Sequence, residues 1–74
     1  MTFPKDDSRR QVLSRAIVAV EKAARSGGVI NATVEARRIM DEFNARDMSL
    51  DHVAVEIARL ASERGLSVEF GEAP

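Results

Sequence analysis

The chain has 74 residues, a formal net charge of −1 and 45% hydrophobic residues, and it contains no cysteine, tryptophan or tyrosine. This length allows one small domain, and the lack of cysteine excludes disulfides and thiolate metal sites. Eleven of the hydrophobic residues are alanine, so we expect a thin core. Because a single core in a chain below about 70–80 residues rarely supplies more than about 3–5 kcal/mol, the composition favours a homodimer.

Residues 1–7 are predicted to form a flexible N-terminal arm, because Pro4 and the charges that follow it disfavour regular structure. The arm lacks the apolar run of a signal peptide. The longest apolar run, residues 16–20, is too short to cross a bilayer. We therefore expect a soluble, cytoplasmic protein with no membrane contact.

The first helix is predicted over residues 8–25. Ser8 and Gln11 have the spacing of a capping box, and Gly27-Gly28 ends the helical pattern. Leu13, Ile17, Val20 and Ala24 recur at 4-3-4 spacing, which is typical of a coiled-coil seam. The apolar face predicted for this helix consists of Val12, Leu13, Ala16, Ile17, Val20, Ala23 and Ala24.

Two further helices are predicted over residues 32–45 and 50–64. Asn31 and Ser49 are suitable N-caps, since their side-chain oxygens accept hydrogen bonds from first-turn N–H groups. Gly65 and Leu66 predict a Schellman ending for the last helix. The core expected from the three apolar stripes is Leu13, Ile17, Val20, Ile39, Phe43, Val53, Ile57 and Leu60.

The C-terminal tail, residues 66–70, alternates apolar and polar side chains as a short strand does. A single strand cannot satisfy its own backbone, and Val29-Ile30 is the only other extended candidate. Either these two segments pair within one chain, or two tails pair across a dimer. We expect the tail to bury Phe70, on the first two helices or in the dimer contact, and residues 71–74 to fray. The fold class is mainly α: a small three-helix domain over residues 8–70 with a short C-terminal extended tail.

The sequence contains no recognisable catalytic group of residues, so we expect no enzyme activity and no cofactor. His52 precedes Glu56 by four residues, and Asp47 or Asp51 is close enough in sequence to serve as a third metal ligand. Two ligands from one helix make a poor site. A solvent-exposed histidine is the better interpretation, and no metal site is predicted.

The segments 31–43 and 48–49, and the ending Glu-Arg-Gly-Leu-Ser-Val-Glu-Phe, resemble those of small bacterial helical proteins. This resemblance indicates no family and no function.

The function predicted from the sequence is a homodimeric protein–protein interaction or regulatory module, with an unknown protein as a further possible partner. The evidence for this function is that the chain has more apolar surface than its predicted core buries. Three valines lie off the main stripes of their helices, and the tail strand lacks an obvious partner. The predicted interaction residues are Val18, Val34, Val55, Val68 and Phe70.

The alternative is a nucleic-acid-binding regulator of helix-turn-helix type that uses the basic face of the first helix. Residues 1–28 carry a charge of +3 and residues 29–74 a charge of −4. This division fits charge complementarity between packed helices as well as a basic binding surface. The acidic third helix and the pI of about 5.8 argue against the alternative. Its candidate residues are Arg9, Arg10, Arg15, Lys22 and Arg25.

Overall fold

The computed structural model describes residues 4–45 and 47–71, with side chains from Arg9 onward. Along the chain, the elements are α1 (Pro4–Arg25), β1 (Val29–Asn31), α2 (Ala32–Phe43), α3 (Leu50–Glu63) and β2 (Ser67–Glu69). The prediction of a mainly α domain with three helices and a short extended tail is confirmed.

Helix α1 begins at Pro4, four residues before the expected start at Ser8. Proline is well tolerated at the first position of a helix, because the N–H group that it lacks has no partner there in any case. The prediction of an irregular arm is therefore wrong for residues 4–7, and residues 1–3 lie outside the described residues. At the other end, Gly27 has φ of +113°, and the Gly28 N–H donates to the Ala23 carbonyl at 2.9 Å, which completes a Schellman ending.

The predicted caps of α2 and α3 are confirmed. The Asn31 side chain accepts a hydrogen bond from the Val34 N–H at 3.0 Å, and the Ser49 hydroxyl accepts one from the His52 N–H at 3.3 Å. Helix α3 ends as predicted: Gly65 has φ of +77°, and the Leu66 N–H bonds to the Ala61 carbonyl at 3.0 Å.

Helix α2 ends at Phe43, two residues earlier than predicted. Asn44 takes the left-handed conformation, with φ of +53°, and the Ala45 N–H then donates to the Met40 carbonyl at 2.9 Å. Asparagine thus ends α2 in the way that glycine ends the other two helices.

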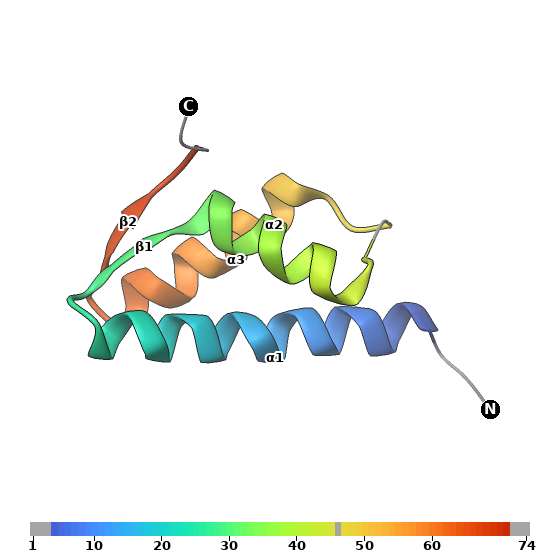
Figure 1. Cartoon of the computed structure of the whole chain (residues 1–74), viewed down its shortest axis with the longest axis horizontal. Helices are drawn as coiled ribbons and strands as arrows, with labels where there is room; N and C mark the ends of the chain where they lie inside the picture. Colours follow the sequence, from blue (N-terminus) through green and yellow to red (C-terminus); the bar gives the residue numbers. More distant parts are fainter. Residues whose placement is uncertain (1–3, 46, 72–74) are drawn as a thin grey trace.

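Helices α2 and α3 lie side by side against α1, and consecutive helices run in opposite directions (Figure 1). The two strands lie together at the end of the domain where α1 and α3 finish and α2 begins. The N-terminal half of α1 lies at the opposite end of the domain from the strands (Figure 1).

The core lies between the three helices, and alanine supplies much of it. The expected core residues Val20, Ile39, Val53 and Ile57 are buried. Phe43 and Leu60 are partly buried against the core. The buried hydrophobic residues of the described chain are Val12, Ala16, Ala19, Val20, Ile30, Ala32, Ala36, Ile39, Ala45, Val53, Ala54, Ile57 and Ala61.

Leu13 and Ile17 were expected in the core, and this prediction is wrong: Leu13 is 36% exposed and Ile17 is 51% exposed. The stripe that α1 buries contains Val12, Ala16 and Ala19 instead. Small side chains on this stripe allow the other two helices to approach α1 closely. As a result, Leu13 and Ile17, the two largest side chains of the predicted seam, lie at the edge of the contact between α1 and the other helices.

Strands β1 and β2 pair in parallel, with Val29 opposite Ser67, Ile30 opposite Val68 and Asn31 opposite Glu69. Of the two alternatives, pairing within one chain is therefore the one that forms. The Asn31 side-chain amide donates to the Gly71 carbonyl at 2.8 Å, and the Gly71 N–H donates to the Thr33 hydroxyl at 2.9 Å. These bonds hold Gly71 at the start of α2, so the prediction of a frayed end is wrong for Gly71, and residues 72–74 lie outside the described residues.

Phe70 is 59% exposed, so the prediction that it is buried on the first two helices is wrong. Leu66 and Val68 pack against the core from the same side of the strand. Phe70 follows them on this side of the strand, but it is not among the side chains that pack against the core. Its burial in a dimer contact stays a prediction.

Candidate interaction surfaces

Large hydrophobic side chains remain exposed on every helix and on the strand pair. Within residues 9–45 and 47–71, the exposed ones are Leu13, Ile17, Val18, Val29, Val34, Val55 and Phe70. In contrast, no polar or charged side chain of these residues is buried, and none has a buried atom without a hydrogen-bond partner. The chemistry of this domain therefore lies on its surface.

The five predicted interaction residues do not form one patch. Val18, Val34 and Val55 lie on α1, α2 and α3 respectively, and all three are exposed as predicted. Val68 is partly buried against the core, whereas Phe70 is the most exposed large hydrophobic residue of the described chain. Two of the five, Val68 and Phe70, thus belong to one surface at the tail.

The sequence analysis missed Leu13 and Ile17 as surface residues. They are four residues apart and so lie on one side of α1. Leu13 lines a hollow that α1 shares with α3, which places this side of α1 toward α3. The sequence does contain a signal for this arrangement. Val12, Ala16 and Ala19 form a second stripe at helical spacing on α1, and its alanines permit closer contact between helices than Leu13 and Ile17 do.

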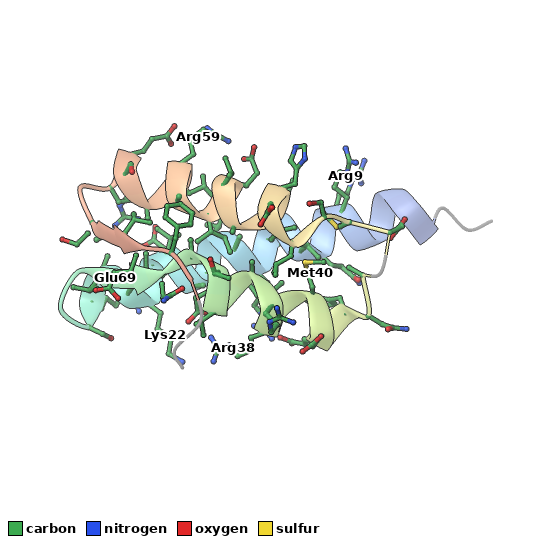
Figure 2. The ribbon with its side chains drawn as sticks, turned by 90° about the horizontal axis from the view of Figure 1, so that it is seen from above. Arg9, Lys22, Arg38, Met40, Arg59 and Glu69 are labelled. Carbon is green, nitrogen blue, oxygen red and sulfur yellow. The ribbon has the colours of Figure 1, made fainter. Side chains whose placement is uncertain are left out.

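The basic residues of α1 are divided between its two sides. Arg15 and Lys22 line a groove of about 230 Å³ between α1 and α2, together with Arg38 of α2. Arg9 lines the hollow beside α3, and Figure 2 shows it on the opposite side of the molecule from Lys22 and Arg38. The residues proposed for nucleic-acid binding therefore do not make one continuous basic face.

Glutamates neutralise much of the charge in this groove. Arg15 donates to Glu42 of α2, and Arg38 forms an ion pair with Glu35 at 2.6 Å. The hydrogen bond from Arg15 lowers the pKa of the Glu42 carboxyl, and the charges of Arg15 and Arg38 lower that pKa further. A phosphate that approached this groove would thus meet two arginines already engaged by carboxylates.

Ion pairs also connect elements that are distant in sequence. Arg15 of α1 pairs with Glu42 of α2, and Arg64, after α3, pairs with Glu21 of α1. The first joins the basic N-terminal part of the chain to its acidic remainder, as charge complementarity between packed helices predicts. Because both pairs are exposed, each contributes little to the stability of the domain.

His52 lines a hollow of about 480 Å³ between the N-terminal half of α1 and the start of α3. Glu56 and Asp47 line the same hollow, as the metal hypothesis required, whereas Asp51 does not. However, Glu56 is engaged by Arg59 at 2.7 Å, and Ser49 is engaged as the N-cap. Over the described residues, no three histidine or acidic side chains come together to hold a metal ion.

No helix in the described part of the chain is both long enough and apolar enough to span a membrane. Comparisons with models of protein families, with curated proteins and with solved structures give no significant match.

Proposed function

We propose that this protein is a homodimeric interaction module, acting in the cytoplasm as a small regulator or adaptor. The observation that carries the proposal is the distribution of apolar side chains. Seven of the thirteen buried hydrophobic residues in the described chain are alanine, while Leu13, Ile17 and Phe70 lie at the surface. The chain thus keeps several of its largest hydrophobic residues outside its own core.

Association with a second copy would remove part of this apolar surface from water. Burying a side chain of this size contributes about 1.5–3 kcal/mol. For 74 residues, typical stabilities of about 0.05–0.15 kcal/mol per residue amount to about 4–11 kcal/mol in all. A few such side chains in a dimer contact would therefore contribute a large share of the stability of so small a domain.

The proposal is tested by thermal unfolding at protein concentrations that differ a hundredfold. Unfolding of a dimer releases two chains, so its melting temperature rises with protein concentration. We expect such a rise. A melting temperature that is the same at all concentrations would overturn the proposal.

Nucleic-acid binding through α1 is the alternative, and the groove that holds Lys22 and Arg38 is the surface that it would use. Its test is binding of a mixed-sequence DNA duplex at low salt by the full chain and by the double variant Arg15→Ala, Lys22→Ala. Arg9→Ala is the matched control, since Arg9 lies on the other side of the molecule (Figure 2). We expect no binding. Binding that the double variant loses and the control keeps would favour the alternative.

A further inference from the structure

The two-stranded sheet has two open edges in the described chain, because β1 and β2 pair only with each other. An open strand edge carries unpaired N–H and C=O groups and is a template for pairing with another chain. A two-stranded sheet is also marginal by itself, and a sheet of more strands is more stable. The question is therefore which edge is suited to accept a further strand.

Hydrogen bonds within the sheet show which groups of β2 face outward. The Ser67 N–H donates to the Gly28 carbonyl at 2.8 Å, so Ser67 is directed toward β1. In a ladder of this kind, alternate residues bond to the same neighbour. Glu69 is therefore also directed toward β1, and the N–H and C=O groups of Val68 point to the outer edge.

The outer edge of β1 is less suited to pairing. Gly27 and Gly28 precede β1 with φ of +113° and +80°, which is not extended backbone. Directly after β1, α2 begins, and Asn31 at the end of the strand is its N-cap. By contrast, β2 continues into Phe70, the most exposed large hydrophobic residue of the described chain.

We propose that two copies of this chain pair through the outer edges of their β2 strands, antiparallel and with the two-fold axis at Val68. This inference rests on the proposed homodimer and names its contact. Val68 then faces the partner's Val68, and the two residues exchange a pair of hydrogen bonds. The result is one four-stranded sheet in the order β1–β2–β2–β1.

This register makes the strand complementary to itself. Leu66 lies opposite the partner's Phe70, so that the exposed ring gains an apolar cross-strand neighbour. Ser67 lies opposite the partner's Glu69, so that the two glutamates are not directly opposed. Apolar cross-strand pairs stabilise a sheet, whereas like charges directly opposite each other destabilise it. A closed two-fold contact of this kind also uses the same surface on both copies.

Cysteine cross-linking tests the register, because the natural chain contains no cysteine. Ser67→Cys and Glu69→Cys are both substitutions at exposed positions, so neither disturbs the core. In the proposed register, residue 67 faces residue 69 of the partner as a pair without hydrogen bonds, with Cα atoms about 4.5 Å apart. That separation lies within the span of a disulfide, about 4.4–6.8 Å.

The two variants are oxidised mildly, first separately and then as a mixture. Two copies of the same variant place their cysteines on a diagonal, about 7–8 Å apart, where a disulfide does not form without strand movement. We expect the mixture to give several-fold more covalent dimer than either variant alone. In the additional dimer that the mixture gives, the disulfide joins the cysteine introduced at position 67 of one variant to the cysteine introduced at position 69 of the other.

The mass of each unoxidised variant is measured in the same samples. A non-covalent dimer whose mixture gives no more cross-link than the single variants would overturn the contact through β2 and leave the proposed homodimer intact. A monomeric mass at all concentrations would overturn both. Selective cross-linking of the mixture in a sample of dimeric mass would support both.

Discussion

Two isoleucines on neighbouring helices provide a matched test of the packing. Ile57 of α3 is fully buried, whereas Ile17 of α1 is 51% exposed. Replacing a buried isoleucine by alanine removes apolar contacts and leaves a cavity, at a cost of about 2–5 kcal/mol. Alanine is also the better helix former, by a few tenths of a kcal/mol, but this gain is the same at both positions.

Ile17→Ala is expected to cost less than about 1 kcal/mol, because half of the side chain already contacts water and no enclosed cavity is left. The spacing of Leu13, Ile17, Val20 and Ala24 predicts the opposite, namely that Ile17 belongs to the core. The comparison of Ile17 with Ile57 therefore decides between the seam expected from the sequence and the stripe that the structure shows.

Urea unfolding, followed by circular dichroism at a single low protein concentration, measures both costs. With a slope of about 1 kcal/mol/M for a domain this small, Ile57→Ala lowers the midpoint by about 2–5 M and Ile17→Ala by less than about 1 M. Equal losses at the two positions would refute the packing of α1 described above.

Three further predictions concern a helix end, the tail and an ion pair. Gly65→Ala should cost about 1–2 kcal/mol in the free energy of unfolding, because an L residue is strained at φ of +77°; the new Cβ would meet no neighbour, so no clash adds to this cost. D-alanine at the same position, introduced by chemical synthesis, should instead stabilise by about 0.4–1 kcal/mol. Asn31→Asp keeps the acceptor that caps α2 but loses the donor to Gly71, so hydrogen exchange should accelerate at the end of the tail while α2 stays protected; faster exchange in α2 as well would contradict this separation. Arg15→Gln should raise the pKa of the Glu42 carboxyl in an NMR titration, because it removes the Arg15 guanidinium, whose hydrogen bond and positive charge lower this pKa. Since that pKa is lowered by folding, the pair stabilises the native state above the ordinary pKa of glutamate and stops doing so as the pH falls through the lowered value; an unchanged Glu42 titration in the variant would count against the pair.

Local signals in the sequence predicted the helices and most of their ends. Asn31, Ser49 and Gly65 act through bonds to residues within a few positions of themselves, so their roles follow from short-range spacing. The end of α2 was missed because Asn44 is less specific than glycine for the left-handed conformation. The start of α1 was missed because proline is common both after the end of a helix and at the first position of a helix. The sequence around Pro4 does not decide between these two positions.

The rotation of α1 could not be predicted from its own sequence. Both the Leu13–Ile17 seam and the Val12–Ala16–Ala19 stripe have helical spacing, and α2 and α3 decide between them by packing on the stripe with smaller residues. The same limit applies to the surfaces. Arg38 shares a groove with Lys22, and His52 shares a hollow with Arg9. Both arrangements depend on how the helices pack together, which cannot be predicted from the spacing of residues along one helix.

The most direct test of the homodimer is the mass of the full chain in solution, measured by sedimentation equilibrium over a wide range of concentrations. One chain has a mass of 8.1 kDa, and a dimer has twice that mass. We predict that the measured mass approaches the dimer value as the concentration rises. A mass of 8.1 kDa that does not change over the whole range would contradict the account.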